Sequence, residues 1–213
     1  MIEDVLPDLR LIAVLDPGRL RGRDLVRAAC DAVAGGATLV QLRMKGVSAA
    51  AYHDAARLLV GRVPAPVYIN DRADVAWTAG AAGVHVGPDD IPAGGLRAAA
   101  TRPFGVGVSV GSRDEAAAVP AGGVDYWSVG PVFRTASKPD AGEPLGVTGW
   151  RTLAALAPPG MPVVGIGGID PANAAAVIRA GAAGVAVIRA ICDAPDIRRA
   201  ARDLRDAVDA AGH

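Results

Sequence analysis

Eight short apolar runs, each followed by an alanine-rich segment of helical character, are the feature that most limits what this chain can fold into. The runs are rich in β-branched residues and continuously apolar rather than alternating, as expected for parallel strands that are covered on both faces. We predict strands at residues 9–15, 38–42, 66–69, 83–86, 105–109, 126–129, 162–166 and 184–188. Helical patterns lie between them, for example at residues 24–35, 49–60, 112–119 and 173–180.

Glycine and capping residues separate these units. Glycine-rich phrases that can end a helix precede the second, fourth, sixth and eighth strands, at residues 34–37, 79–83, 121–124 and 180–184. Ser48, Ser112 and Asp170 stand where helix N-caps are expected. A doubly wound sheet normally uses roughly five or six strands. Eight units in 213 residues therefore predict an α/β protein with a single (β/α)8 TIM barrel, one domain over residues 1–213.

The balance of charge bears on which partners the chain can have. Lys plus Arg and Asp plus Glu both number 22, so no net field favours nucleic acid or an anionic membrane surface. The first residues lack the basic region of a signal peptide, and no apolar stretch reaches the roughly 18 residues needed to span a bilayer. We expect a cytoplasmic protein that acts on small molecules, without nucleic-acid or membrane partners. The sequence leaves the oligomeric state open, including a homo-oligomer.

Two carboxylates follow consecutive predicted strands. Asp71 comes after the third strand and Asp90 after the fourth, and neighbouring strands of a barrel end on the same rim. Mg²⁺ typically takes one or two carboxylates together with waters and phosphate oxygens. Taken singly, Asp71 is compatible with a helix N-cap and Asp89 with a turn. Their joint position leads us to predict a Mg²⁺ site at Asp71 and Asp90.

Three further clusters suit a phosphorylated ligand. Gln41, Arg43 and Lys45 alternate, so their side chains leave the second strand on one side, although Lys45 alone also fits a solvated strand end. The long irregular segment 131–146 contains Thr135, Ser137 and Lys138, the composition of a phosphate clamp; a disordered surface loop is the alternative. The usual phosphate site of barrels falls at the glycines of residues 165–168 and the strand end at residues 187–189.

Ser109, at the end of the fifth strand, is placed to offer a hydroxyl to the same rim. Nucleophilic serine chemistry requires a base beside the hydroxyl. His53 lies in a helical pattern and His85 within the fourth strand, and neither is expected to be that base. We interpret His85 as a core or rim residue.

In these motifs, at residues 41–45, 69–72, 83–90, 105–109, 130–138 and 165–169, the chain resembles the thiamine phosphate synthase family over essentially its whole length. The resemblance implies a transferase that joins a hydroxymethyl-aminopyrimidine diphosphate to a thiazole phosphate. The products would be thiamine phosphate and diphosphate, formed through a pyrimidine methyl cation. Such dissociative chemistry needs positioning and charge stabilisation rather than a protein nucleophile.

The resemblance also implies residue roles. Asp71 and Asp90 would hold Mg²⁺ on the diphosphate, and the catalytic cations that neutralise the leaving group would be Arg43, Lys45 and Lys138. Contacts to the diphosphate or pyrimidine would come from Gln41, Asn70 and Ser109. The thiazole phosphate would be surrounded by Thr135, Ser137, Gly168 and Ile188.

Arg189 departs from the family, which typically has Ser at this position. Either its side chain turns inward and contacts the thiazole phosphate, which we favour because barrels place a phosphate site here, or it faces solvent or pairs with an acid.

Two other functions fit the same fold. One is the related thiazole tautomerase branch, an isomerase that needs no metal and has a His where this chain has Gly111. The other is a non-catalytic barrel that binds a phosphorylated heterocycle, against which the presence of both Asp71 and Asp90 argues.

Overall fold

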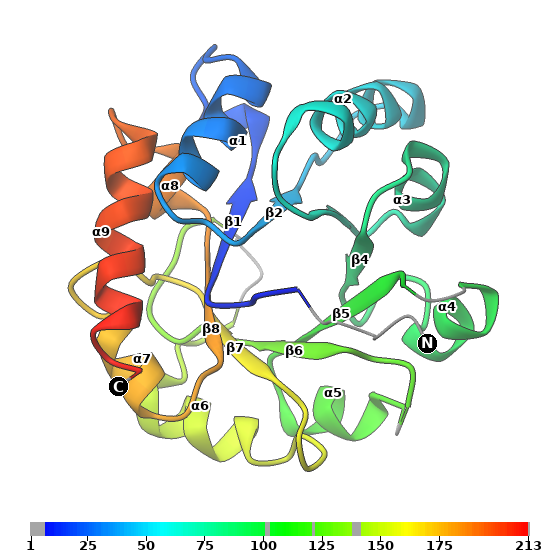
Figure 1. The fold of residues 1–213 in the computed structure, drawn as a ribbon. Helices are drawn as coiled ribbons and strands as arrows, with labels where there is room; N and C mark the ends of the chain where they lie inside the picture. The colour runs from blue at the N-terminus through cyan, green and yellow to red at the C-terminus, as the bar shows by residue number, and fades with distance from the viewer. Residues whose placement is uncertain (1–6, 101–102, 121, 138–141, 213) are drawn as a thin grey trace.

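A computed structural model describes residues 7–100, 103–120, 122–137 and 142–212. Within these ranges, eight parallel strands pair in chain order, and β1 also pairs with β8, so the sheet closes into a barrel (Figure 1). The predicted (β/α)8 barrel is confirmed. The strands are β1 (Leu11–Leu15), β2 (Leu39–Leu42), β3 (Val67–Asn70), β4 (Gly83–Val86), β5 (Gly105–Val110), β6 (Tyr126–Val129), β7 (Val163–Ile166) and β8 (Gly184–Val187).

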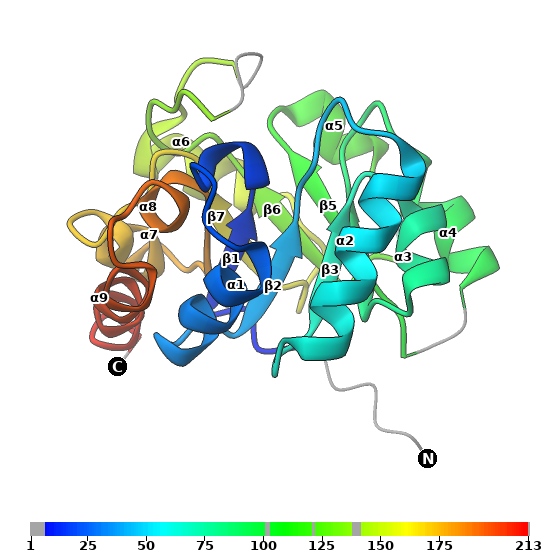
Figure 2. The ribbon, with the colours of Figure 1, turned by 90° about the horizontal axis from the view of Figure 1, so that it is seen from above.

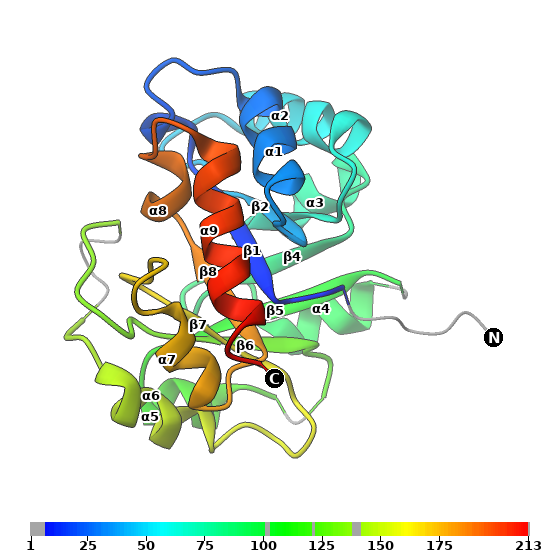
Figure 3. The ribbon, with the colours of Figure 1, turned by 60° about the vertical axis from the view of Figure 1, so that its left-hand side comes forward.

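Helices surround the barrel. They are the 3-10 helix η1 (Pro17–Arg19), then α1 (Leu25–Ala34), α2 (Ala49–Arg62), α3 (Ala73–Ala79), α4 (Ala93–Ala99), α5 (Arg113–Ala118), α6 (Gly146–Ala154), α7 (Ala174–Arg179), α8 (Arg189–Cys192) and α9 (Ile197–Asp209). Figure 2 shows α1, α2 and α3 side by side along one flank. In Figure 3, α9 packs alongside α1 and α7, so the last helix closes the ring against the first. In the described residues, no helix is both long and apolar enough to cross a membrane.

Side-chain caps fix where several helices begin. Ser48 Oγ accepts a hydrogen bond from the Ala51 N–H at 3.2 Å, and Ser112 Oγ accepts from the Glu115 N–H at 3.1 Å, as predicted for N-caps. The prediction for Asp170 is wrong, because the N-cap of α7 is Asn173. Asp170 Oδ1 instead accepts from the Ala172 and Asn173 N–H groups, at 2.9 and 3.2 Å, in a turn that precedes the helix.

The interior of the barrel is filled by aromatic rings that lie over glycines. Tyr68 of β3 and Tyr126 of β6 are 1% exposed, with ring centroids 6.2 Å apart. A Cβ at Gly105 would lie 1.8 Å from the Tyr68 hydroxyl oxygen, and one at Gly107 would lie 2.3 Å from the Tyr126 ring. The two glycines of β5, Gly105 and Gly107, therefore make room for the rings of Tyr68 and Tyr126 in the barrel interior.

The variant Gly107→Ala tests this packing. The added Cβ would lie 2.3 Å from the Tyr126 ring and 2.6 Å from His85 Nδ1, inside any allowed contact. We expect the free energy of unfolding, measured by chemical denaturation, to fall by about 1–3 kcal/mol. The matched control is Gly61→Ala in α2, where the new Cβ meets no atom within 4 Å. That control should keep or raise stability, by up to about 1 kcal/mol. Equal stability of the two variants would contradict this account of the barrel interior.

Candidate active site

A cavity of about 610 Å³ opens at the carboxyl ends of the strands and takes side chains from all eight. Every predicted site residue within the described ranges lines it: Gln41, Arg43, Lys45, Asn70, Asp71, Asp90, Ser109, Thr135, Ser137, Gly168, Ile188 and Arg189. Lys138 lies outside the described residues. The barrel thus brings together groups that are separated by up to roughly 150 residues of sequence, as parallel barrels do at this face.

Asp71 and Asp90 form an acidic corner of the cavity. The Asp71 side chain pairs with the Lys45 ammonium, and Asp90 Oδ2 accepts a hydrogen bond from the Gly87 N–H at 2.8 Å. Burial raises the pKa of Asp90, and the charge of the neighbouring Asp71 raises it further. Two crowded carboxylates of this kind are the hard oxygen ligands that Mg²⁺ prefers. In the described residues no group of three or more His, Cys, Asp or Glu side chains is arranged to hold a metal.

Backbone strain places the Asp71 side chain. Asp71 has φ +66°, in the left-handed region that costs a non-glycine residue about 1–3 kcal/mol. Its N–H donates to the His85 carbonyl at 2.8 Å, which fixes this conformation against β4. The N-cap of α3 is Arg72 and makes no side-chain capping bond, so the helix-cap alternative for Asp71 does not hold.

Arg43 is held by an acid that the sequence analysis missed. Arg43 Nη1 lies 2.8 Å from Asp16 Oδ2, and both side chains are largely buried. Asp16 also caps η1 by accepting from the Gly18 N–H at 3.0 Å. The sequence did contain a signal for Asp16, because this residue directly follows the first predicted strand, just as Asp71 follows the third. Tyr52 supports the same region, since its hydroxyl lies 2.7 Å from the Leu42 carbonyl oxygen and 2.9 Å from that of Asn70.

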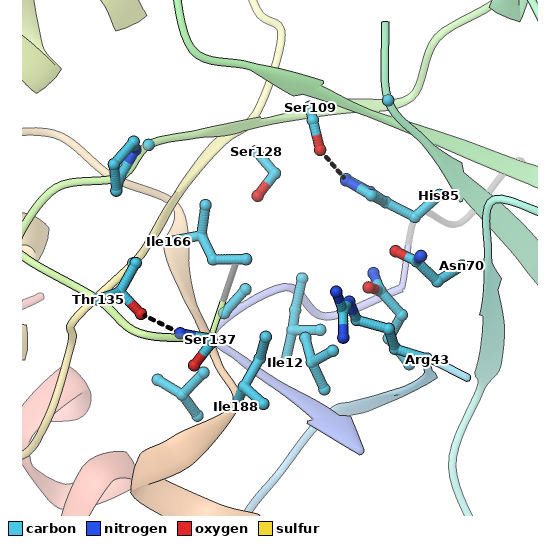
Figure 4. A pocket seen from close by; sticks show the side chains of 18 of the residues that line it. Ile12, Arg43, Asn70, His85, Ser109, Ser128, Thr135, Ser137, Ile166 and Ile188 are labelled. Atoms are coloured by element: carbon cyan, nitrogen blue, oxygen red, sulfur yellow. Dashed lines mark hydrogen bonds between the residues drawn. The ribbon is translucent and has the colours of Figure 1, made fainter. Parts of the chain in front are cut away.

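A buried hydrogen-bonded network crosses the cavity floor. His85 Nε2 lies 3.0 Å from Ser109 Oγ (Figure 4), and His85 Nδ1 lies 2.8 Å from the Tyr126 hydroxyl. Burial strongly raises the pKa of Tyr126, and the polar side chain of Gln41 opposes that rise. His85 is confirmed as a buried residue at the rim, whereas the expectation that neither histidine is a partner of Ser109 is wrong in geometry. His85 pairs in register with Gly107, two residues before Ser109, so both side chains face the barrel interior on neighbouring strands.

The opposite side of the cavity has the features of an anion site. Gly167 and Gly168 have φ +98° and +65°, and a Cβ at Gly168 would lie 2.6 Å from the Arg134 carbonyl oxygen. Thr135 Oγ1 accepts from the Ser137 N–H at 3.2 Å. Arg19 Nη2 donates to the Ala136 carbonyl at 3.2 Å, so the first loop supports this segment. Glycines in the left-handed region, followed in space by a loop that carries hydroxyls, suit a phosphate.

Arg189 begins α8 and lines the cavity, with its Nε 3.1 Å from Asp193 Oδ2. Asp193 also lies 3.5 Å from Arg19 Nη1. The Arg189 side chain therefore pairs with an acid, the alternative to the inward-turned arrangement that we favoured from the sequence. Because a guanidinium carries five N–H donors, pairing through Nε leaves donors for an anion.

A closed parallel barrel with cations, carboxylates and a glycine-rich anion site at its carboxyl face defines an enzyme that acts on small phosphorylated molecules. Residues 11–191 match the family model described as "Thiamine monophosphate synthase", and the chain belongs to that family. The resemblance seen in the motifs is confirmed.

Named relatives agree over nearly the full length. The chain is 42% identical to a thiamine-phosphate synthase of Azorhizobium caulinodans, over 95% of this chain and 96% of that protein. It is 45% identical to one of Xanthobacter autotrophicus, over 96% and 97%. A solved thiamine phosphate pyrophosphorylase from Pyrococcus furiosus superposes with a TM-score of 0.84 at 33% identity, covering 96% of this chain and 98% of that one. A 3-hexulose-6-phosphate synthase, at 23% identity and a TM-score of 0.69, shares the fold alone.

The variant Tyr126→Phe tests the network under the cavity. It deletes only the hydroxyl that is bonded to His85 Nδ1 and leaves the buried imidazole without that partner. We expect the free energy of unfolding to fall by about 1–3 kcal/mol in chemical denaturation. An unchanged free energy of unfolding would show that the network adds nothing to the fold.

Proposed function

We propose that this chain joins a hydroxymethyl-aminopyrimidine diphosphate to a thiazole phosphate, giving thiamine phosphate and diphosphate. Family membership and the full-length relatives support this transferase reaction. The observation that carries it is the division of one cavity into two anion-binding ends. Arg43, Lys45 and the carboxylate pair form one end, and the glycine and hydroxyl groups near Gly168 form the other.

The chemistry requires little of the protein beyond charge and position. The bond between the pyrimidine methylene carbon and the diphosphate oxygen breaks, and its electron pair leaves with the diphosphate. The aminopyrimidine delocalises the resulting positive charge, and the lone pair of the thiazole nitrogen forms the new carbon–nitrogen bond. In this proposal Arg43 and Lys45 neutralise the departing diphosphate, and Lys138, outside the described residues, does the same from the loop after β6. Fixed charges in a closed site are the largest single source of stabilisation in such reactions.

Asp71 and Asp90 are the residues that would hold Mg²⁺. The ion would supply charge neutralisation on the diphosphate oxygens. Asn70 directly precedes Asp71 at the end of β3, and Gln41 lines the cavity from β2. We propose that both contact the diphosphate or the pyrimidine. We further propose that Thr135, Ser137, Gly168 and Ile188 bind the thiazole phosphate, and that Ser109, supported by His85, contacts the pyrimidine.

Turnover of the purified protein tests the function and the metal together. With both substrates and Mg²⁺ we expect thiamine phosphate, measured chromatographically, and little of it in EDTA. Asp71→Ala and Asp90→Ala should each lower kcat/KM by a factor on the order of 10³, since each removes charge stabilisation worth several kcal/mol.

Asp74→Ala is the matched control. Asp74 is an exposed carboxylate three residues from Asp71, paired with Arg72 and outside the cavity, and its removal should leave turnover near the wild-type rate. Near wild-type rates for the Asp71 and Asp90 variants at saturating Mg²⁺ would refute the metal site. Isomerisation of the thiazole phosphate without condensation would point to the tautomerase branch, and binding without turnover to a non-catalytic barrel.

Arg189→Ser tests the arginine at the second anion site. We expect the KM for the thiazole phosphate to rise several-fold, because a charge-assisted contact becomes at best a neutral one. The KM for the pyrimidine diphosphate should change little. Steady-state kinetics with each substrate varied in turn measures both. If the thiazole KM is unchanged, Arg189 serves only its ion pair with Asp193.

A further inference from the structure

One buried hydroxyl in the cavity has no partner. Ser128 of β6 is 2% exposed, and its Oγ makes no hydrogen bond within the part of the chain that the structure describes. The residue lines the cavity, and Figure 4 shows its hydroxyl pointing into the open space between Ser109 and Ile166. A buried hydroxyl left unpaired lowers the stability of a folded protein.

The neighbouring polar groups of the cavity, unlike the Ser128 hydroxyl, have hydrogen-bond partners among the described residues. Ser109 is the register partner of Ser128 on β5, and its hydroxyl is bonded by His85, which in turn bonds Tyr126. Two other buried groups without partners in the described residues are the indole nitrogens of Trp127 and Trp150, and neither residue lines the cavity. Ser128 is therefore the one residue among these three that lines the cavity.

The two faces of the cavity indicate which substrate the Ser128 hydroxyl would bind. The polar residues that line the cavity from β2 to β6 are Gln41, Asn70, His85, Ser109 and Ser128. Figure 4 shows Asn70, His85, Ser109 and Ser128 on one side, whereas β1, β7 and the start of α8 present Ile12, Ile166 and Ile188 on the other. An aminopyrimidine carries an exocyclic amine and two ring nitrogens, so it requires several polar partners. A thiazole has a single ring nitrogen, which must stay unbonded in order to react, and it fits the apolar face.

We propose that Ser128 hydrogen-bonds the aminopyrimidine ring of the diphosphate substrate and so helps to select that ring. This inference rests on the proposed function. A serine hydroxyl can donate to a ring nitrogen or accept from the exocyclic amine, so either polar edge of the ring satisfies it. Ser109 and Ser128, side by side on β5 and β6, then address the ring together.

Ser128→Ala separates this role from a structural one. Removing an unpaired hydroxyl should leave the melting temperature of the protein alone unchanged or higher. In calorimetric titrations with Mg²⁺, the Kd for the pyrimidine diphosphate should rise about 3- to 10-fold, the size of one neutral hydrogen bond. The Kd for the thiazole phosphate should stay the same.

Thr38→Val is the matched control. The Thr38 hydroxyl is already paired, at 3.1 Å from the Leu11 carbonyl oxygen, at the opposite end of the barrel from the cavity. Its removal should lower the melting temperature and leave both dissociation constants unchanged. The two variants thus remove a hydroxyl each, with opposite expected results.

Three outcomes would overturn the inference. They are an unchanged pyrimidine Kd in Ser128→Ala, a weakening confined to the thiazole phosphate, or a lower melting temperature with both Kd values unchanged. If the wild-type protein makes thiamine phosphate and one of these results is found, only the role of Ser128 fails. If the wild-type protein neither binds the pyrimidine diphosphate nor turns it over, the proposed function fails and this inference fails with it.

Discussion

The pairing of β1 with β8 is the interaction on which every feature of the site depends. It aligns Leu11, Ile12 and Ala13 with Val185, Ala186 and Val187, and so turns a linear series of β/α units into a ring. Without it the loops after β1 and β8 would lie at opposite edges of an open sheet. Closure brings Arg19, from the first loop, next to Asp193 after β8 and to Ala136 in the segment after β6. The enclosed site therefore depends first on the closed order of the strands, and then on the individual residues at their ends.

Several groups at this rim reduce the stability of the protein. Asp71 occupies a left-handed conformation, the Asp90 carboxyl is buried against a second carboxylate, and Ser128 has an unpaired hydroxyl in the described structure. A bound cation would reduce the repulsion between the two carboxylates, and a ligand with a polar edge would give the Ser128 hydroxyl a partner. Such groups are tolerated where a ligand compensates for them. They are not confined to the cavity, since Arg21 also has a positive φ and the indoles of Trp127 and Trp150 are unpaired among the described residues.

The sequence was sufficient for the fold because the repeated signals are local. Apolar runs, glycine phrases and caps such as Ser48 and Ser112 each act within a few residues, and eight of them in series leave few topologies. The polar residues at strand ends were found for the same reason. The bond between His85 and Ser109 was missed because it depends on strand register and on which face each side chain takes. The Asp16–Arg43 pair depends on two side-chain conformations in different loops. The error at Asp170 has another cause. Asp is favoured both in turns and at helix N-caps, so its position alone did not distinguish the turn at Asp170 from the N-cap at Asn173.

The balance of positive and negative charge in the whole chain is also found within the site. Three cations that line the cavity are paired with acids among the described residues. The pairs are Arg43 with Asp16, Lys45 with Asp71, and Arg189 with Asp193. Paired in this way, the cations need not repel one another before a phosphate arrives, and each acid fixes the position of its partner. Lys45 and Arg189 are more than half exposed, and a salt bridge of an exposed cation contributes little net energy, so exchanging the acid for a phosphate group costs little at these two residues. An anion that offers more oxygens than a carboxylate can therefore recruit these cations without unfolding any part of the rim.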